Sequence, residues 1–278
     1  MKRTFCALLV VLGVACGSEG ENTAGAGGAG GAGNTGGNAT GSGNGGDLFP
    51  AGSGGTTSSG SGQGGAGDAC DGLLAVVRDF DESHIDFQDD NPGHHAGLVE
   101  STLSSGKPTY AHGNTKMGGI ENTDSFDQWY RDIDGTNQRF EITLNLTPTG
   151  NPDEFEYDNA FFFPVDGMGF GNSGMDGNGT ERNFHFTTEI HTQFEYQPGQ
   201  VFSFRGDDDL WLFIDDQLAI DLGGVHGAME RTVDLDDLGL TPGETYPMDI
   251  FHAERHTSAS NFRMVTTIDC FEQPPVPR

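Results

Sequence analysis

The chain contains few basic residues and no long apolar run. Lysine and arginine together number 13 of 278 residues, against 42 aspartates and glutamates, and the formal net charge is -29 at pH 7. Proteins that bind nucleic acid need a basic surface to neutralise phosphates, so this composition argues against nucleic-acid partners. No stretch reaches the ~20 apolar residues that cross a bilayer as a helix. The acidity favours cation binding, although a generally acidic exported proteome would explain the total charge equally well.

The sequence also lacks the spacings that are typical of hydrolases. No Ser-His-Asp or Cys-His signature is present, and carboxylates are too numerous for any pair to indicate a glycosidase. His252 and His256 flank Glu254, but the apolar alternation of residues 246–250 predicts a strand. In a strand the two imidazoles would lie ~13 Å apart, too far for one zinc ion. We therefore predict a protein without enzymatic activity.

The first residues resemble an export signal. A basic start at 1–3 precedes an apolar run at 5–15 that is too short to span a bilayer. The end of this run resembles a bacterial lipoprotein signal, which predicts a signal peptide at 1–16 with lipidation of Cys16. Ordinary cleavage near Ala15 is the alternative, because Gly13 stands where such signals usually carry leucine. The expected location is the outer membrane, the cell surface or the extracellular space, with a lipid anchor as the membrane attachment.

Composition divides the rest of the chain. Residues 17–67 are almost entirely Gly, Ala, Ser, Asn and Thr, which predicts a disordered linker with a reach on the order of 40 Å. Residues 68–272 form the predicted globular domain, and 273–278 form a tail. If Cys6 leaves with the signal and Cys16 is lipidated, Cys70 and Cys270 remain as a predicted disulfide between the domain ends; two free thiols are the alternative.

Short apolar alternations separated by Gly and Pro turns predict an all-β domain, an antiparallel β-sandwich of the lectin-like jelly-roll type. The clearest is 183–196, where one parity is apolar or Thr and the other is polar, which predicts one long, half-buried strand or a bent pair of strands. Short helices are expected at 96–103 and 124–130, the second capped by Thr123 or Asp124. The predicted strands are 73–77, 139–146, 154–164, 183–196, 201–204, 210–214, 218–222, 231–235, 245–253 and 261–268.

Three successive acids, Asp207, Asp208 and Asp209, join the strands predicted at 201–204 and 210–214. Adjacent carboxylates at a strand end repel one another, and a hard cation with oxygen ligands removes that repulsion. Calcium is the specific interpretation. An acidic, solvated turn is the alternative, because Asp and Gly are ordinary turn formers.

Several separated segments carry a recognisable pattern: Arg78-Asp-Phe80, Gly106-Lys-Pro108, Asn183-Phe-His-Phe-Thr187, Phe204-Arg-Gly-Asp-Asp-Asp-Leu-Trp-Leu-Phe-Ile214, Asp221-Leu-Gly-Gly-Val-His226, Ala253-Glu-Arg-His-Thr257 and Ser260-Asn-Phe262. Together they resemble the bacterial fibro-slime domain over residues 73–269. That family is similar to the protective-antigen-type (PA-fourteen) β-sandwich domains, which include calcium-dependent, sugar-binding adhesins such as flocculins.

The resemblance implies a calcium site. In the related lectins two consecutive aspartates joined by a cis peptide bind calcium, which helps to hold sugar hydroxyls. Their pattern aligns with Asp207 and Asp208, and Asn261 is the counterpart of a ligand from a later loop. The chain departs from the pattern at Asp209, where many relatives have glycine.

Four side chains at or near the acidic junction are candidate ligand contacts: Asp209, Trp211, Glu254 and Arg255. Trp211 adjoins the acidic turn, although packing in the core is the commoner role of a tryptophan. Glu254 and Arg255 are expected to pair and to brace the loop beside Asp207. The sequence thus predicts a surface-tethered module that binds carbohydrate or matrix polysaccharide, with calcium as cofactor. A structural fibre or slime-matrix component and a polysaccharide-acting enzyme are the alternatives.

Overall fold

Antiparallel strands make up almost all of the regular structure. The computed structural model describes residues 72–88, 91–256 and 258–272. The strands are β1 Leu73–Phe80, β2 Asn137–Leu144, β3 Thr147–Pro148, β4 Phe155–Asn159, β5 Gly174–Met175, β6 Glu181–Arg182, β7 Phe186–Glu195, β8 Val201–Gly206, β9 Asp209–Ile214, β10 Gln217–Leu222, β11 Met229–Asp234, β12 Thr245–Glu254 and β13 Phe262–Thr266. The helical turns are α1 Thr123–Phe126 and the 3-10 turn η1 Leu235–Leu238.

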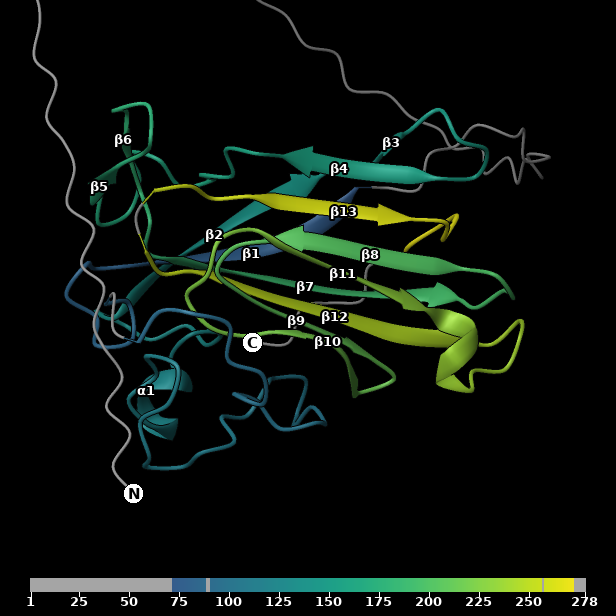
Figure 1. Cartoon of the computed structure of the whole chain (residues 1–278), viewed down its shortest axis with the longest axis horizontal. Coiled ribbons are helices and arrows are strands. Elements are labelled where there is room, and N and C mark those ends of the chain that lie inside the picture. The colour runs from purple at the N-terminus through teal and green to yellow at the C-terminus, as the bar shows by residue number, and fades with distance from the viewer. Residues whose placement is uncertain (1–71, 89–90, 257, 273–278) are drawn as a thin grey trace, which may run out of the picture. The chain divides into compact units, whose positions relative to one another are not determined.

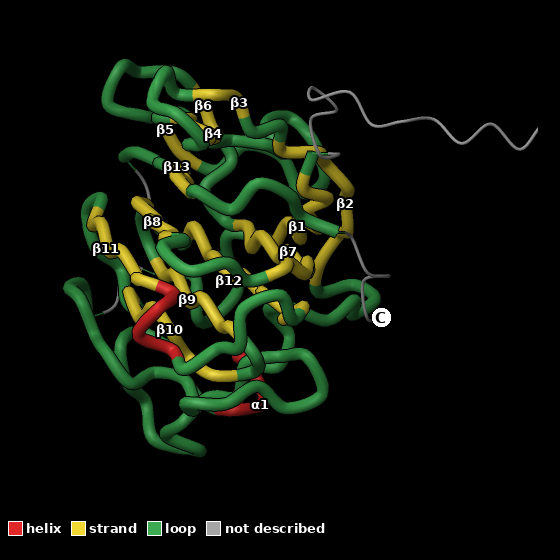
Figure 2. The backbone as a smooth tube through the Cα atoms, turned by 90° about the vertical axis from the view of Figure 1, so that its right-hand side faces the viewer, coloured by secondary structure: helices red, strands yellow, loops and turns green. Residues whose placement is uncertain are grey.

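Two sheets face each other (Figures 1 and 2). The larger has six strands in the order β10-β9-β12-β7-β1-β2, and the smaller has five in the order β11-β8-β13-β4-β3. Phe204 and Phe262 of the smaller sheet pack in one buried cluster with Ile190, Leu212 and Ile250 of the larger. Apolar side chains from one parity of each strand therefore fill the space between the sheets. This confirms the predicted antiparallel β-sandwich.

The outer face of the six-stranded sheet is also buried. Phe126, Trp129 and Tyr130 form a second apolar cluster there with Trp211 and Phe251 of the sheet. Figures 1 and 2 show α1 and its neighbouring loops on the side of this sheet that faces away from β4 and β13. As a result β7 is buried on both faces, and its prediction as a half-buried strand is wrong.

The helix predicted at 96–103 is also wrong. The segment begins with a turn at Ala96 and Gly97, and Val99 and Thr102 then make isolated bridges to Tyr110 and Gln217. The N–H of Leu103 donates to the carbonyl oxygen of Asp216 at 2.9 Å, just before β10 begins. This N–H is therefore paired with another segment and not with a carbonyl of its own helix. The second helix is confirmed but shorter than predicted, and its cap is Asn122, whose side chain accepts from the N–H of Ser125.

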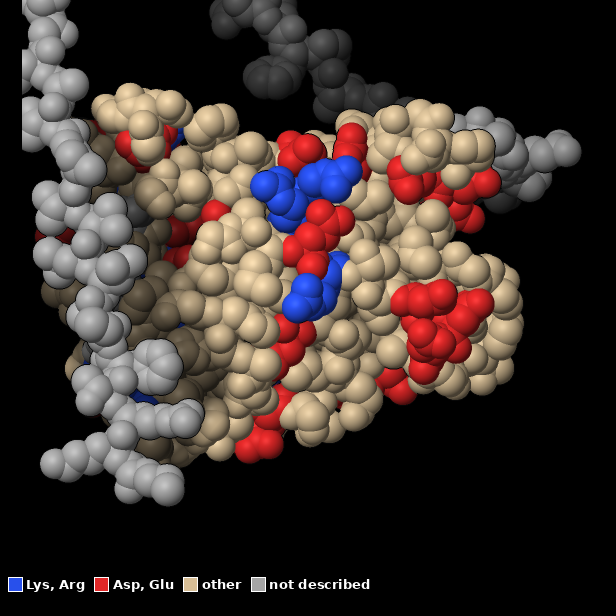
Figure 3. All heavy atoms as spheres, viewed as in Figure 1, with Lys and Arg blue, Asp and Glu red and all other residues tan. Residues whose placement is uncertain are grey.

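On the outer face of the five-stranded sheet, acidic side chains flank a pair of arginines on neighbouring strands. Asp158, Arg263, Arg205 and Glu230 occupy successive paired positions on β4, β13, β8 and β11. Arg263 lies 2.9 Å from a carboxylate oxygen of Glu156. On the face drawn in Figure 3 basic side chains lie beside acidic ones, so this face carries no basic patch.

Several predictions concern residues outside the described ranges. The signal, the linker, Cys16 and Cys70 belong to this group, so lipidation and the disulfide stay predictions; Cys270 follows β13. Within the described residues, no helix has the length and apolarity needed to cross a membrane.

Candidate functional site

Three connections between the two sheets converge at one end of the sandwich. The chain crosses from β8 to β9 at Asp207–Asp208, from β10 to β11 at residues 223–228 and from β12 to β13 at residues 255–261. The strand register places them together, because Gly206 pairs with both Met229 and Phe262, while Asp209 pairs with Ala253. The acidic junction predicted from the sequence is therefore the point where the chain changes sheets.

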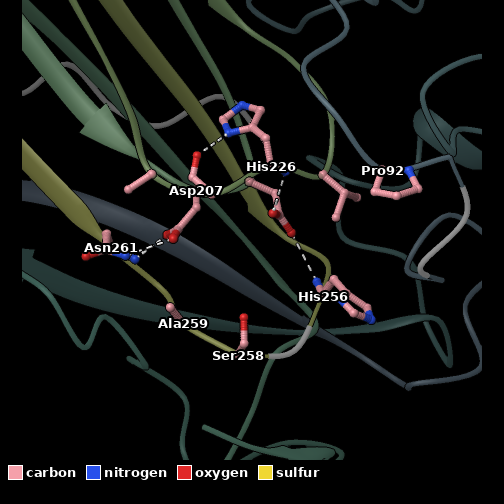
Figure 4. A pocket seen from close by; sticks show the side chains of 11 residues that line it. Pro92, Asp207, His226, His256, Ser258, Ala259 and Asn261 are labelled. Carbon is pink, nitrogen blue, oxygen red and sulfur yellow. Dashed lines mark hydrogen bonds between the residues drawn. The ribbon is translucent and has the colours of Figure 1, made fainter. Parts of the chain in front are cut away.

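Asp207 is held by the β12–β13 connection. The backbone N–H of Asn261 donates to one carboxylate oxygen, and the Asn261 Nδ2 donates to the other at 2.8 Å (Figure 4). Burial raises the pKa of Asp207, and the two bonds from Asn261 partly oppose this rise. The structure thus brings together two of the three predicted metal ligands.

Asp208 is held by backbone donors from two connections. Its Oδ1 accepts from the N–H of His226 at 3.0 Å, and its Oδ2 accepts from the N–H groups of Arg255 and His256, both at 3.1 Å. Burial, with the nearby charges of Asp209 and Asp207, raises the pKa of Asp208 to about 8, although Arg255 opposes the rise. The peptide bond between Asp207 and Asp208 is cis, as the resemblance implies.

The conformation of the β10–β11 connection requires glycine beside the acids. Gly224 has a φ of 107°, and its N–H donates to Asp209 Oδ1 at 2.5 Å. A Cβ at this position would lie 2.2 Å from the carbonyl oxygen of Gly93. A side chain here would therefore displace the N–H that satisfies Asp209.

The four candidate ligand contacts do not reach the surface. Asp209, Trp211, Glu254 and Arg255 are each 0% exposed, so the prediction that they touch a ligand directly is wrong. Trp211 packs on the outer face of the six-stranded sheet and donates from Nε1 to Asp221 at 3.0 Å. Core packing, the commoner role, therefore applies to this tryptophan.

The predicted pairing of Glu254 with Arg255 is also wrong, because adjacent strand residues point to opposite faces. Arg255 Nε lies 2.6 Å from Asp209 Oδ2 on the outer face, and its other nitrogens donate to the carbonyls of Asp86 and Gly118. Glu254 points between the sheets, and neither of its oxygens has a hydrogen-bond partner. Burial and the charges of Asp208 and Asp207 raise the pKa of Glu254 well above its usual range. Ser260 and His256 lie nearby and partly oppose this rise, although neither is close enough in geometry to form a hydrogen bond with Glu254.

The histidines near the acids have structural roles. His252 is fully buried, and its Nε2 lies 2.8 Å from the carbonyl oxygen of Asp207. Both ring nitrogens of His226 lie 3.0 Å from carbonyl oxygens of its own turn, those of Gly227 and Leu222. His226 therefore stabilises the turn, and its backbone N–H positions Asp208.

The acids open onto a pocket of about 400 Å³, here called the cation pocket. It is lined by Pro92, Asp207, Asp208, Val225, His226, Gly227, Ala228, His256, Ser258, Ala259 and Asn261. Its side-chain oxygens come from two carboxylates, one amide and the hydroxyl of Ser258, and calcium binds carboxylate and amide oxygens. No group of three or more His, Cys, Asp and Glu side chains in the described ranges is placed to hold a metal. Calcium here would therefore need Asn261, backbone carbonyls and water to complete its ligands.

Residues 176–270, which include Asp207, Asp208 and Asn261, match the family model described as PA14 domain. Protein psiR of Dictyostelium discoideum is 41% identical over 181 residues, which cover 62% of this chain and 18% of that protein. Protein psiD of the same organism is 39% identical over 212 residues, 72% of this chain and 42% of that protein. The chain thus spans less than half the length of these relatives.

Two solved structures are similar at low identity. The PA14 sugar-binding domain from an RTX adhesin has a TM-score of 0.32 and 13% identity, covering 71% of this chain and 89% of that one. A subtype-switched Epithelial Adhesin 9 A domain from Candida glabrata, in complex with beta-lactose, has a TM-score of 0.34 and 13% identity, covering 76% and 84%. The family match and the sheet architecture together support a PA14-related β-sandwich, and the resemblance to the bacterial fibro-slime domain stays a prediction.

Proposed function

We propose that this PA14-related domain is a calcium-dependent carbohydrate-binding module of the adhesin type, with Asp207, Asp208 and Asn261 holding the cation. The observation that carries the proposal is an imbalance of charge at the cation pocket. Asp207 and Asp208 are 4% and 5% exposed, and the neighbouring Arg255 is already committed to Asp209. The two buried carboxylates are thus satisfied by N–H donors but not by a full positive charge.

Calcium fits this imbalance for a physical reason. Ionised carboxylates out of water are costly unless a charge compensates them, and here burial raises the pKa of both groups. A divalent cation at the pocket surface would stabilise both ionised forms and would keep coordination positions open to solvent. The hydroxyl oxygens of a sugar are suitable ligands for those positions. Asp207, Asp208 and Asn261 would bind the cation, and the surrounding loops would orient the sugar.

The metal is tested by thermal unfolding with and without calcium. A ligand at a hundredfold excess over its Kd adds about 2.7 kcal/mol, which for a domain of this size raises the Tm by roughly 5 to 10 °C. Asp208→Ala and Asn261→Ala should lose most of this response, whereas Asp237→Ala, which removes an exposed acid on η1, should keep it. An equal calcium response in Asp208→Ala and the parent would contradict the assignment.

The sugar is tested separately on a glycan array. The parent should bind a subset of glycans in calcium, and a chelator or Asn261→Ala should abolish the signal. Concentration-dependent assembly without any glycan signal would favour a structural matrix component instead. Turnover of a polysaccharide would favour the enzyme alternative.

A further inference from the structure

A second pocket lies next to the cation pocket and shares His256 with it. Its volume is about 420 Å³, and it is lined by Glu82, Ser83, Phe87, Gln88, His185 and His256. The 82–88 turn follows β1 and belongs to the segment on the outer face of the six-stranded sheet, whereas His185 precedes β7. Segments far apart in the sequence therefore form this pocket, as they form the cation pocket.

His256 separates the two pockets. Its backbone N–H donates to Asp208 Oδ2 at 3.1 Å, and Figure 4 shows its imidazole pointing away from that carboxylate. The backbone of this residue thus belongs to the wall behind the acids, and its ring extends toward the second pocket. A ligand that extends out of the cation pocket on this side would contact the His256 ring.

His185 gives the second pocket a polar group that the fold does not use. The side chain is 6% exposed and lines the pocket, yet its Nδ1 has no hydrogen-bond partner. Burial lowers the pKa of His185 to about 4, so the ring is neutral at neutral pH and carries one N–H. In a neutral ring one nitrogen donates and the other accepts, so the imidazole can pair with a ligand hydroxyl in either role.

The turn opposite His185 is fixed and polar. Gln88 Nε2 donates to the carbonyl oxygens of Glu82 and His84 at 2.7 and 3.0 Å, which closes the turn. Glu82 and Gln88 are exposed, whereas Phe87 is only 1% exposed and packs edge-on to the His185 ring at 6.2 Å between centroids. Ser83 Oγ donates to Asp81, so the pocket offers a carboxylate, an amide oxygen, a hydroxyl oxygen and the His185 imidazole over a small aromatic floor.

We propose that this second pocket is a saccharide subsite, which holds the sugar unit adjacent to the one bound at the cation pocket. The inference rests on the proposed function and extends it from one sugar to an oligosaccharide that passes His256. A sugar unit presents several hydroxyls that both donate and accept, which matches a lining of mixed donors and acceptors.

Other ligand classes fit the second pocket less well. Glu82 lies in the pocket and Asp81 is next to it, so phosphate and other anions meet like charge. The buried Phe87 ring offers too little apolar surface for a hydrophobic ligand.

The subsite is tested by calorimetric titration in calcium with three matched probe pairs: galactose and lactose, glucose and cellobiose, and N-acetylglucosamine and chitobiose. At least one disaccharide should bind the parent about tenfold more tightly than its monosaccharide. Glu82→Ala and His185→Phe should each weaken that disaccharide about five- to tenfold, the loss expected for a hydrogen bond, and should leave the monosaccharide unchanged. His185→Phe removes no side-chain hydrogen bond within the described residues, because the hydrogen bonds of His185 there are made by its backbone.

Glu100→Ala is the control, since Glu100 is an exposed acid of the same outer segment. Unchanged disaccharide affinity in both pocket variants, or equal losses for disaccharide and monosaccharide, would overturn the subsite while leaving the cation site standing. A parent that binds none of the six sugars would overturn the proposed function and the subsite together.

Discussion

Individual residues around the junction are organised by charge pairing. Arg255 is 0% exposed, its Nε contacts Asp209, and its guanidinium carbon lies 5.1 Å from the centroid of the Trp129 ring. The Arg255 side chain holds Asp209 at the start of β9. The Arg255 backbone N–H donates to Asp208, so the same residue positions both acids. Trp211 and Arg255 thus stabilise the site from the buried outer face of the six-stranded sheet, where neither contacts a ligand.

Arg255→Met should destabilise the domain strongly. The methionine keeps the apolar stem but leaves Asp209 as a buried charge without its cation, a change that costs about 3 to 5 kcal/mol. In urea unfolding the double variant Arg255→Met with Asp209→Asn should be less destabilised than the sum of the single variants, since asparagine can still accept from the Gly224 N–H. Additive free energies of unfolding would show that the pair is not coupled.

At the scale of elements, the buried outer face of β7 holds a network of ionised groups. His191 lies between Asp249 of β12 and Glu189, with Nε2 2.5 Å from Glu189 Oε1 and Nδ1 bonded to Asp249. Glu189 also pairs with Arg78 at 2.6 Å and with Lys107. Burial raises the pKa of Glu189, but His191, Lys107 and Arg78 outweigh it and lower the pKa to about 2. Burial opposes the charged His191 ring, but the bonds to both carboxylates outweigh it and raise its pKa.

His191 should make stability depend on pH. A raised folded-state pKa means that the stabilisation is fully present below the usual histidine value of about 6.5 and is lost as pH rises through the folded pKa. The Tm of the parent should therefore fall from pH 6 toward alkaline pH, and His191→Gln should flatten this fall. The exposed His94 provides the control His94→Gln, which should keep the parent profile. Identical slopes for parent and His191→Gln would exclude the role of His191.

The buried network on β7 shows that the alternation of apolar residues predicts one buried face of a strand but not a second. The apolar parity of β7 was enough to find the strand, its period and its inward face. The opposite parity, with Glu189 and His191, would be predicted to face solvent, because no local signal shows that side chains between residues 98 and 130 pack over this sheet face. Similarly, adjacent acids predicted the junction at Asp207–Asp208, whereas the partnership of Arg255 with Asp209 follows from the register of β12 on β9. The second pocket depends on loop packing, which leaves no periodic signal.

At the scale of the whole molecule, the predicted anchor determines where the domain acts. If Cys16 is lipidated, the linker at 17–67 would hold the sandwich some tens of Å from the membrane, within reach of extracellular glycans. Cys16→Ser should therefore move the protein from the membrane fraction to the medium or the soluble fraction, as judged by fractionation and immunoblotting. Ser18→Ala is the control and should keep the parent distribution. Equal membrane association of the Cys16 variant and the parent would rule out this anchor.

The predicted disulfide would close nearly the whole domain into one loop. Cys70 and Cys270 flank the described sandwich, and β1 and the segment after β13 both belong to the six-stranded side, where Gln193 of β7 pairs with Glu272. In the chain-entropy model a loop of two hundred residues contributes about 5 kcal/mol, an upper value because strain and residual structure in the unfolded chain reduce it.

Reduction, or Cys70→Ser, should therefore lower the midpoint of urea unfolding substantially, and the two treatments should not add, because each breaks the same bond. Mass spectrometry of non-reduced peptides identifies the linked pair; unmodified thiols at both positions in the exported protein would contradict it.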